Sequence, residues 1–247
     1  MIRPYVADLH VHSLLSPCAA VEMTPRNIVW HAAENGIDIV AITDHNAGDN
    51  VRAAMEAAKG TSVTVLPGME VETKEEVHFI ALFGKMRAFM AWEQTVENHR
   101  SGRRNDAVKF GAQFVVDADD NLICEKEAML LSSLTLSIKE ACEIVADLGG
   151  LAIASHIDRP SYSLLSQLGF IPPGLKLAAV EISPRLARAE AMQKIPLLKD
   201  WPLVTNSDAH TIDDFVSGPK TVFDLAEPTL AEIRQALNNE NSRRVVV

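Results

Sequence analysis

Two histidines near the start of the chain, His10 and His12, are separated by a single residue. The surrounding run, Tyr5–Val11, is mostly apolar and follows Pro4, which is typical of a short buried strand. Alternate residues of a strand point to the same face, so the two imidazoles would lie side by side. Two such imidazoles can bind one metal ion together, although an isolated pair is equally consistent with two unrelated polar residues.

Similar polar clusters recur at or near the ends of other expected strands. Six of the eight histidines fall in these clusters, and only His31 and His99 lie on expected helix surfaces. This distribution predicts a polynuclear metal site. For two of the candidate ligands a structural role is an alternative to metal binding: Glu70 could be a surface carboxylate, and His78 could be a core histidine near the start of its strand. The further candidate ligands are His45, Glu70, His78, His156, Asp208 and His210.

Strands and helices alternate along most of the chain. Thr24 is expected to cap a helix with Pro25 in its first turn and Gly36 at its end, and Thr229 to open the last helix. The repeated units predict parallel strands, and therefore an α/β barrel or an open doubly wound sheet. The expected strands cover residues 5–11, 38–43, 63–66, 77–83, 151–155, 177–182, 203–205 and 221–224.

The pattern changes between residue 85 and about residue 133. Residues 87–104 have a polar, helical pattern, and residues 113–124 contain the turn-rich Ala118-Asp-Asp-Asn121 between apolar runs, which predicts a hairpin. We interpret residues 1–247 as a single domain with an insertion at about 85–133. The insertion is a candidate lid or recognition element.

The composition narrows the range of functions. A chain of 247 residues, 47% of them hydrophobic, is long enough for one large α/β domain. Neither a membrane-spanning run nor a signal peptide is visible, and the three cysteines form no CxxC pair, so we expect a cytoplasmic protein that does not bind membranes. The net charge of -10 argues against long nucleic acid, but not against a nucleotide or a strand end.

The ordered clusters resemble the motifs of the PHP family, named after polymerase and histidinol phosphatase. A single HxH is weak evidence, whereas several motifs in the right order are specific. The likeness runs from about residue 3 to residue 247, apart from the insertion, and implies a distorted (β/α)7 TIM-like barrel with a trinuclear metal site. The matching motifs are Asp8-Leu-His-Val-His12, Thr43-Asp-His-Asn46, Gly68-Met-Glu-Val71, His78, Ser155-His156 and Asn206-Ser-Asp-Ala-His210.

The resemblance implies three sets of ligands for two or three divalent ions, which we expect to be zinc, manganese or iron. Related sequences complete the third set with a His or Asp in the loop after HxH, where the nearest residue here is Cys18. A thiolate would favour zinc or iron over magnesium, but Cys18 could also be a small structural residue, with Glu22 or water in its place. Asp8 and Asp44 are expected to orient imidazole N–H groups from behind the ligands. The implied sets are His10, His12, Glu70 and Asp208; Glu70, His78 and His156; and Cys18, His45 and His210.

The implied activity is that of a metal-dependent phosphoesterase, which hydrolyses a small phosphorylated metabolite or nucleotide with a metal-activated hydroxide. His45, His210 and Asp208 are the candidate catalytic residues, the histidines as acids for the leaving group. An exonuclease or nucleotide-bisphosphate phosphatase is an alternative, and a non-catalytic, metal-stabilised regulatory module is another. The oligomeric state is left open. The candidate phosphate-binding cations are, in order, Arg159, Arg185 and Lys220.

Overall fold

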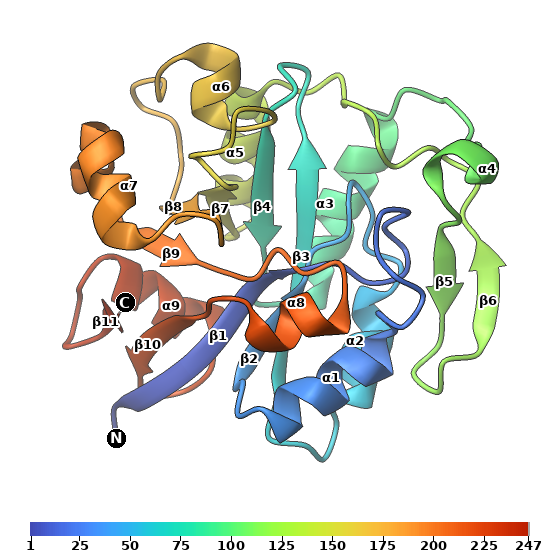
Figure 1. Ribbon diagram of the computed structural model, residues 1–247, viewed down its shortest axis with the longest axis horizontal. Helices are drawn as coiled ribbons and strands as arrows, with labels where there is room; N and C mark the ends of the chain where they lie inside the picture. The colour runs from blue at the N-terminus through green and yellow to red at the C-terminus, as the bar shows by residue number, and fades with distance from the viewer. Residues whose placement is uncertain (247) are drawn as a thin grey trace.

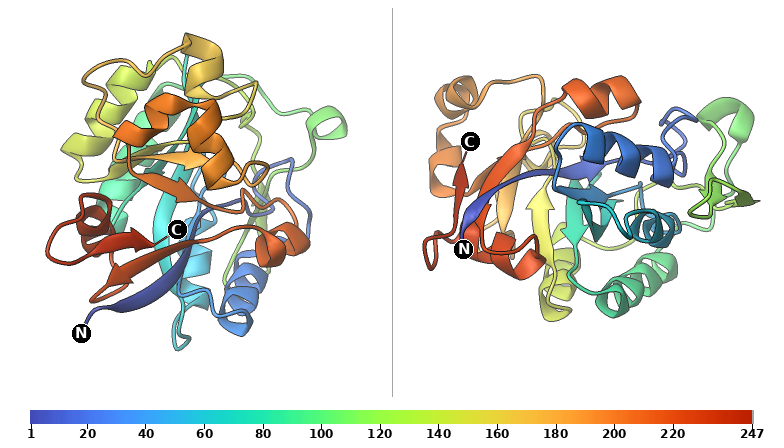
Figure 2. Two further views of the ribbon diagram at one scale, coloured as in Figure 1. Left: turned by 60° about the vertical axis from the view of Figure 1, so that its left-hand side comes forward. Right: turned by 90° about the horizontal axis from the view of Figure 1, so that it is seen from below.

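The computed structural model describes residues 1–246, which form a strongly curved sheet with helices around its outer side (Figures 1 and 2). The strand order in these residues is β11-β10-β1-β2-β3-β4-β7-β8-β9. A bridge between Val11 and Ala209 brings the chain after β9 against the end of β1, so the seven strands from β1 to β9 in this order form a nearly closed barrel. The distorted TIM-like barrel is therefore confirmed, and the open sheet is excluded.

The elements agree closely with those expected from the sequence. The barrel strands are β1 (Arg3–Val11), β2 (Ile39–Ile42), β3 (Thr64–Glu72), β4 (His78–Leu82), β7 (Leu151–Ala154), β8 (Ala179–Ile182) and β9 (Leu203–Thr205); β10 (Thr221–Leu225) and β11 (Arg244–Val246) extend the sheet beyond β1. The helices are α1 (Pro25–Glu34), α2 (Val51–Ala57), α3 (Met86–Asn98), α4 (Ala107–Phe110), α5 (Ile138–Asp147), α6 (Leu164–Leu168), α7 (Arg188–Lys194), α8 (Ile212–Ser217) and α9 (Leu230–Leu237), with a 3-10 turn at Pro196–Asp200. A separate hairpin consists of β5 (Phe114–Val116) and β6 (Leu122–Glu125).

Helix caps explain where several helices begin. The Thr24 hydroxyl accepts a hydrogen bond from the Asn27 N–H at the start of α1. Thr229 caps α9 as predicted, by accepting from the Glu232 N–H. The Glu232 carboxylate, however, accepts from the Ala226 N–H and from Arg243 and does not complete the capping box. The side chain of Glu232 therefore joins α9 to the chain on either side of it.

The barrel differs from a regular TIM barrel, in which all strands are parallel, in the direction of one strand. β1, β2 and β3 are parallel, and so are β7, β8 and β9, but β4 is antiparallel to both β3 and β7. The first residue of β4 therefore lies at the same end of the barrel as the last residues of its neighbours. This places His78, at the start of β4, among the ligand candidates at the other strands' C-terminal ends.

Two apolar layers occupy the two faces of the barrel wall. The inner layer consists of alternate residues of successive strands, and its members include Leu9, Ala41, Leu66, Ile80, Ile153, Ala179 and Val204. The residues between them, such as Val40, Phe79 and Val180, pack outward with the helices. Inward-facing positions above the inner layer are polar, and they form the mouth of the barrel.

Two local features turn polar side chains into this mouth. The pairing register of β1 shifts between Asp8 and Val11. As a result Leu9, His10 and His12 all lie on the inner side, while Val11 packs outward. β3 was expected to end at Leu66, with Glu70 beyond it; instead the strand continues to Glu72. It does so because β4 returns directly along it and pairs with Gly68 to Glu72.

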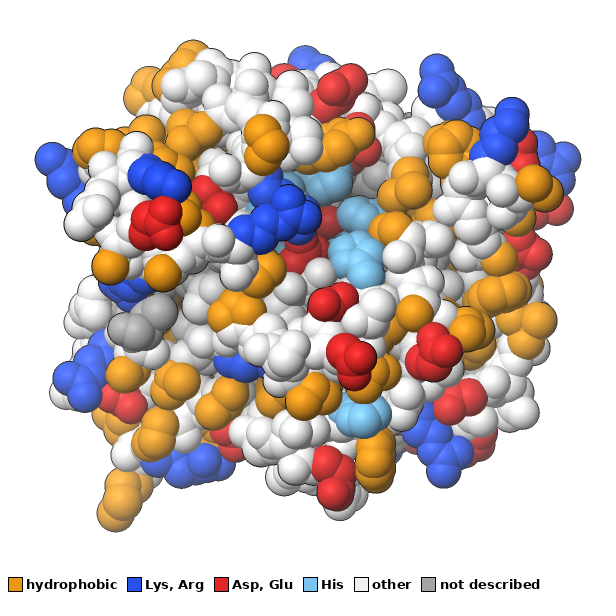
Figure 3. All heavy atoms as spheres, viewed as in Figure 1, with side chains coloured by type: hydrophobic (Ala, Val, Ile, Leu, Met, Phe, Trp, Pro, Cys, Tyr) orange, Lys and Arg blue, Asp and Glu red, His pale blue; other side chains and the backbone are white. Residues whose placement is uncertain are grey.

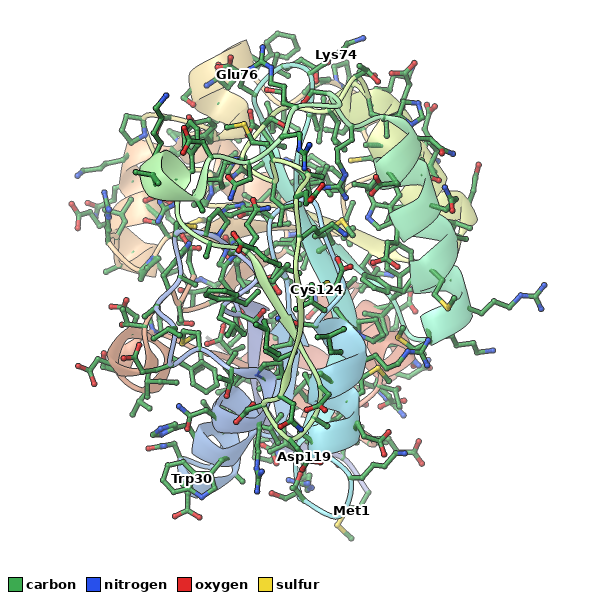
Figure 4. All side chains as sticks on the ribbon, turned by 90° about the vertical axis from the view of Figure 1, so that its right-hand side faces the viewer. Met1, Trp30, Lys74, Glu76, Asp119 and Cys124 are labelled. Carbon is green, nitrogen blue, oxygen red and sulfur yellow. The ribbon has the colours of Figure 1, made fainter. Side chains whose placement is uncertain are left out.

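Residues 85–133 form α3, α4 and the β5–β6 hairpin, and the predicted hairpin is confirmed. Figure 4 shows this hairpin running along the side of the molecule, with Cys124 on β6 and Asp119 at the far turn. α3 ends at Asn98, earlier than the pattern of 87–104 indicated. Within residues 1–246, no helix is both long and apolar enough to cross a membrane.

Candidate metal centre

Glu70 lies at the centre of the polar mouth, inside a ring of histidines. The carboxylate is almost completely buried, and its oxygens lie 3.1–3.5 Å from one ring nitrogen of each of five histidines. The five come from the ends of β1, β2 and β7 and the start of β4, so they meet only in the folded barrel. They are His10, His12, His45, His78 and His156.

Asp208 supplies a second carboxylate to the same cluster. Its Oδ1 lies 3.3 Å from His10 Nε2 and 3.4 Å from His12 Nε2. Asp208 has a φ of +51° and His156 a φ of +28°, in the left-handed region that non-glycine residues rarely adopt. Such strained backbone is typical of functional sites, where it is held by the surrounding structure.

His45 and His210 lie on the outer side of the cluster, against His12. The ring centroids are 4.5 Å apart for His12 and His45 and 4.2 Å apart for His12 and His210. Cys18 is exposed at the rim, and its thiol interacts with the rings of His210 and His45. Although the residue is exposed, its thiol is partly shielded from water, which opposes ionisation; the two rings outweigh this effect and lower the pKa of Cys18 to about 6, which suits a thiolate ligand.

Three groups of these side chains have ligand atoms close enough to hold a metal ion: His12, His45 and His210; His10, His12 and Asp208; and His45, Glu70 and His78. Two donor atoms about 2.1 Å from a tetrahedral ion are about 3.4 Å apart, which matches the separations around Glu70. Glu70 Oε1 is buried and makes no hydrogen bond within residues 1–246, although three ring nitrogens lie 3.2–3.3 Å from it. Donors that face a shared space and not one another are what a cation requires, so the residues fit divalent metals.

The tautomers of three histidines support the same conclusion. His10 Nδ1 donates to the Glu181 carboxylate at 3.0 Å, and His210 Nδ1 donates to the Asp208 carbonyl at 2.9 Å. The Ser16 hydroxyl donates to Asp44, so it accepts from His12 Nδ1 at 3.0 Å. In each ring the proton is therefore on Nδ1, and the lone pair is on Nε2. The Nε2 atoms of His10 and His12 face the carboxylates, as in metal-binding histidines oriented from behind.

Glu181 is the functional residue that the sequence interpretation missed. It is buried at the inner face of β8, where it accepts from His10 Nδ1, from the His156 N–H at 2.9 Å and from Asn206 Nδ2 at 2.7 Å. The alternation of inward- and outward-facing residues along β8 could have identified Glu181 from the sequence. Ala179 faces inward, so Glu181, two residues later, must also face inward and reach the mouth.

Asp8 and Asp44 lie behind the ligands, but neither contacts an imidazole as expected. Asp44 accepts from Ser13 and Ser16, and burial raises its pKa to about 6 against these hydrogen bonds. Asp8 accepts from the Ser207 N–H and lies 3.3 Å from Lys220 Nζ. Lys220 therefore anchors Asp8 beneath the cluster and does not face a substrate.

The candidate phosphate-binding arginines lie to one side of the cluster. Arg159 Nη2 is 2.6 Å from Asp208 Oδ2, and the arginine side chain is 27% exposed. Arg185 is exposed and makes no contact with the cluster; it lines a hollow of about 370 Å³ together with Arg159 and Lys194. Figure 3 shows histidine and acidic side chains at the bottom of a depression, with Lys or Arg side chains beside them.

The insertion holds the rim of the cluster in place. Asn50 lies in the loop between β2 and α2. Its side chain donates to Ser13 Oγ and to the Phe114 carbonyl and accepts from the Val116 N–H. Arg100 donates to the Asn46 carbonyl next to His45. Gly111 lies so close to the Pro17 carbonyl that any side chain there would collide with it. The β5–β6 hairpin and α3 thus support the loops that carry Cys18 and His45.

Comparison with known proteins identifies relatives of part of the chain. The 5'-3' exoribonuclease Rnm of Salmonella typhimurium strain LT2 is 32% identical over 108 residues, which are 40% of this chain and 36% of the relative. The chain thus matches only about a third of that relative's length.

Solved structures resemble the whole fold. The lesion-specific endonuclease PfuEndoQ from Pyrococcus furiosus has a TM-score of 0.76 at 19% identity and covers 99% of this chain and 58% of its own. An amidohydrolase from Chromobacterium violaceum has a TM-score of 0.59 at 19% identity, over 87% of this chain and 90% of its own. At this identity the likeness establishes the fold alone.

A family model, the PHP domain, matches residues 8–158. The match covers more than half of the chain and includes Glu70 and five of the histidines around it. Together with the barrel and the buried cluster, it confirms the predicted family. The chain belongs to the PHP domain family.

Proposed function

We propose that the protein is a metal-dependent phosphoesterase that hydrolyses a phosphoester bond in a nucleotide or at the end of a nucleic-acid strand. The observation that carries this proposal is the convergence of six histidines, Glu70 and Asp208 on one mouth, with Arg159 fixed beside them. No other group of this kind is formed by His, Cys, Asp or Glu within residues 1–246.

The cluster would hold two or three divalent ions. His10, His12, Asp208 and Glu70 would bind the first ion, Glu70, His78 and His156 the second, and His45 and His210 with Cys18 the third. When bound, such ions neutralise phosphoryl oxygens and lower the pKa of water, which is the chemistry phosphoester hydrolysis requires. Zinc, manganese and iron all suit a set of imidazoles and carboxylates.

The chain's own residues would supply binding and proton transfer. Arg159 presents a guanidinium at the depression, where it can donate two parallel hydrogen bonds to a phosphate once Asp208 turns to a metal. Arg185 and Lys194 would attract further phosphates along the adjoining hollow. His210 is the most exposed histidine of the cluster; when its Nε2 binds no ion and the ring carries a second proton there, His210 would protonate a leaving oxygen while Nδ1 stays bonded to the Asp208 carbonyl.

The printed names of the relatives shift the expected substrate toward nucleic acid. One is an exoribonuclease, and a structural neighbour, Endonuclease Q, was determined with a 27-mer duplex substrate that has an abasic lesion at the active site. This finding goes against the expectation that long nucleic acid is an unlikely partner, and it does not support a small sugar or amino-acid phosphate. The net charge of -10 still favours contact near a strand end over binding along a duplex.

We further propose that residues 1–247 act as one domain, in which the insertion at 85–133 borders the substrate. The hydrogen bonds of Asn50 and Arg100 support this arrangement, since they tie the insertion to the loops after β1 and β2. On this proposal the insertion fixes the outer wall of the depression.

The proposed function can be tested with a substrate panel and the metal-reconstituted protein. The panel compares a 5'-phosphorylated oligoribonucleotide, its 5'-hydroxyl counterpart, a nucleoside monophosphate and glucose 6-phosphate. We expect hydrolysis of at least one nucleotide substrate, loss of that activity with chelator, and a fall of about 10³-fold or more in Glu70→Ala. Absence of hydrolysis across the panel at full metal occupancy would contradict the proposal.

A further inference from the structure

Tyr162 is the one aromatic residue other than histidine that stacks on a histidine of the cluster, within residues 1–246. Its ring centroid lies 4.8 Å from that of His78, with an angle of 28° between the planes. His78 Nδ1 in turn lies 3.2 Å from Glu70. A group lying on the free face of Tyr162 would therefore be separated from the central carboxylate by two stacked rings.

The ring is held at the surface and not drawn into the core. Tyr162 is 44% exposed, although its neighbour Ser163 is buried. The Tyr162 side chain is thus accessible from solvent, and a ligand would meet the ring face opposite His78.

The backbone at Tyr162 is in a strained conformation, which fixes the position of the ring. Tyr162 has a φ of +58°, in the left-handed region that a bulky side chain rarely adopts. Two hydrogen bonds hold it there: the His78 N–H donates to the Tyr162 carbonyl, and the Ser163 hydroxyl donates to the Arg159 carbonyl. Strain fixed in this way on the wall of a site is typical of a residue with a function.

The loop between β7 and α6 carries side chains that would bind a phosphate and a side chain that would bind an aromatic base. It carries His156 in the cluster, Arg159 on Asp208 and Tyr162 on His78. A nucleotide has a matching layout, with a phosphate joined through a sugar to a flat aromatic base. With the phosphate at the metals and Arg159, the base would extend to the rim of the depression.

We propose that Tyr162 is the stacking platform for the base of the nucleotide whose phosphoester is hydrolysed. This proposal rests on the function proposed above and narrows the substrate to one that carries a base next to that phosphoester. Every base has an aromatic face, and stacking on a single ring does not distinguish the base edges. Tyr162 would therefore require a base without selecting among the four.

The test uses a matched pair of substrates that differ only in the base. One is 5'-phosphorylated diadenylate, and the other is the same dinucleotide with an abasic 5' residue. Tyr162→Ala should lower kcat/KM for the first about 10- to 100-fold, mainly through KM, and leave the second within twofold. Tyr162→Phe keeps the ring and should match the wild type on both. Tyr162→Asn tolerates the left-handed backbone and should behave as Tyr162→Ala does.

Two controls separate stacking from a structural role. Phe170→Ala removes another exposed aromatic side chain, 55% exposed and beyond α6, and should change neither substrate. Metal content should be equal in all variants. If Tyr162→Ala lowers the rates for both dinucleotides equally, or loses metal, the residue merely covers His78 and the proposal is wrong.

A binding measurement separates this proposal from the proposed function. Adenosine has no phosphoester, and its binding is measured by calorimetry with the metal-loaded protein. Adenosine should bind to the wild type and to Tyr162→Phe at least about tenfold more tightly than to Tyr162→Ala. Equal binding to all three would overturn the stacking proposal even if the enzyme hydrolyses nucleotides. Unequal binding would support it even if neither dinucleotide is hydrolysed.

Discussion

Replacing Glu181 by glutamine is the sharpest perturbation of the cluster that leaves every candidate ligand in place. The two carboxylate oxygens accept from His10 Nδ1, from the His156 N–H and from Asn206 Nδ2. Glutamine has the same shape but a single acceptor oxygen. The substitution therefore changes hydrogen bonding in a buried site and adds no cavity.

Neither orientation of the glutamine amide satisfies all of its neighbours. If its NH₂ group replaces Oε1 it faces the Asn206 NH₂, and if it replaces Oε2 it faces the His156 N–H. Asn206 cannot rotate to compensate, because its Oδ1 already accepts from the Leu9 N–H. One buried N–H loses its acceptor in either case, at a cost of about 1–3 kcal/mol.

A second cost should fall on metal binding, because His10 Nδ1 lies 3.1 Å from Oε1 and 3.0 Å from Oε2 and its N–H therefore faces the glutamine NH₂ in either orientation. In the metal-free protein His10 can turn away from this NH₂ group, whereas a bound ion requires the His10 Nε2 to face Glu70 and Asp208. About 1–3 kcal/mol corresponds to about 5- to 150-fold in affinity, in line with the 10- to 100-fold typical of residues that orient metal ligands. Affinity for zinc is measured by competition with a chromogenic chelator, with unfolding in EDTA followed separately.

Glu190→Gln is the matched control. Glu190 lies on the exposed surface of α7, where it pairs with Lys194 and makes no contact with the cluster. We expect unchanged zinc affinity in this variant and weakened affinity in Glu181→Gln. Equal affinity in the two variants would refute the view that Glu181 sets the orientation of His10.

Three further predictions concern the rim and the substrate side of the cluster. With a pKa of about 6, Cys18 is about nine-tenths thiolate at pH 7; in the metal-free protein iodoacetamide should modify it faster than Cys124, with a midpoint near pH 6, and bound zinc should protect it, as peptide mass spectrometry would show. Arg159→Ala should raise KM for a nucleotide substrate about 10- to 100-fold with metal content intact, and unchanged KM would remove it as an anchor. Asn50→Ala should destabilise the fold by about 1–3 kcal/mol and speed hydrogen exchange in the β5–β6 hairpin; unchanged exchange would show that the hairpin is held elsewhere.

Much of the fold was predictable because apolar periodicity and helix caps are local properties. The direction of β4 was not inferred, since an apolar run looks the same in either direction. A signal was nevertheless present: only residues 67–76 separate the expected strands 63–66 and 77–83, and a parallel crossover needs a dozen residues or more. Reading that short connection would have placed His78 at the mouth and explained its position at a strand start.

The candidate site was predictable where side chains follow strand ends and less so where they depend on tertiary contacts. Glu181 could have been found from the alternation of β8 alone. The roles of Ser16 and Lys220 could not, because each depends on a loop folding back onto an aspartate far away in the sequence. The pairing of Arg159 with Asp208 is likewise a product of the closed barrel.

Metal stoichiometry of the wild type and of Glu70→Ala tests the central claim most directly. Both proteins, with Glu190→Ala as a control, are reconstituted with zinc or manganese, desalted and measured by elemental analysis. We predict two or three ions per chain in the wild type and the control, and a loss of more than one ion in Glu70→Ala, because five histidines surround that carboxylate. A metal-free wild type, or the loss of a single ion in Glu70→Ala, would contradict the account.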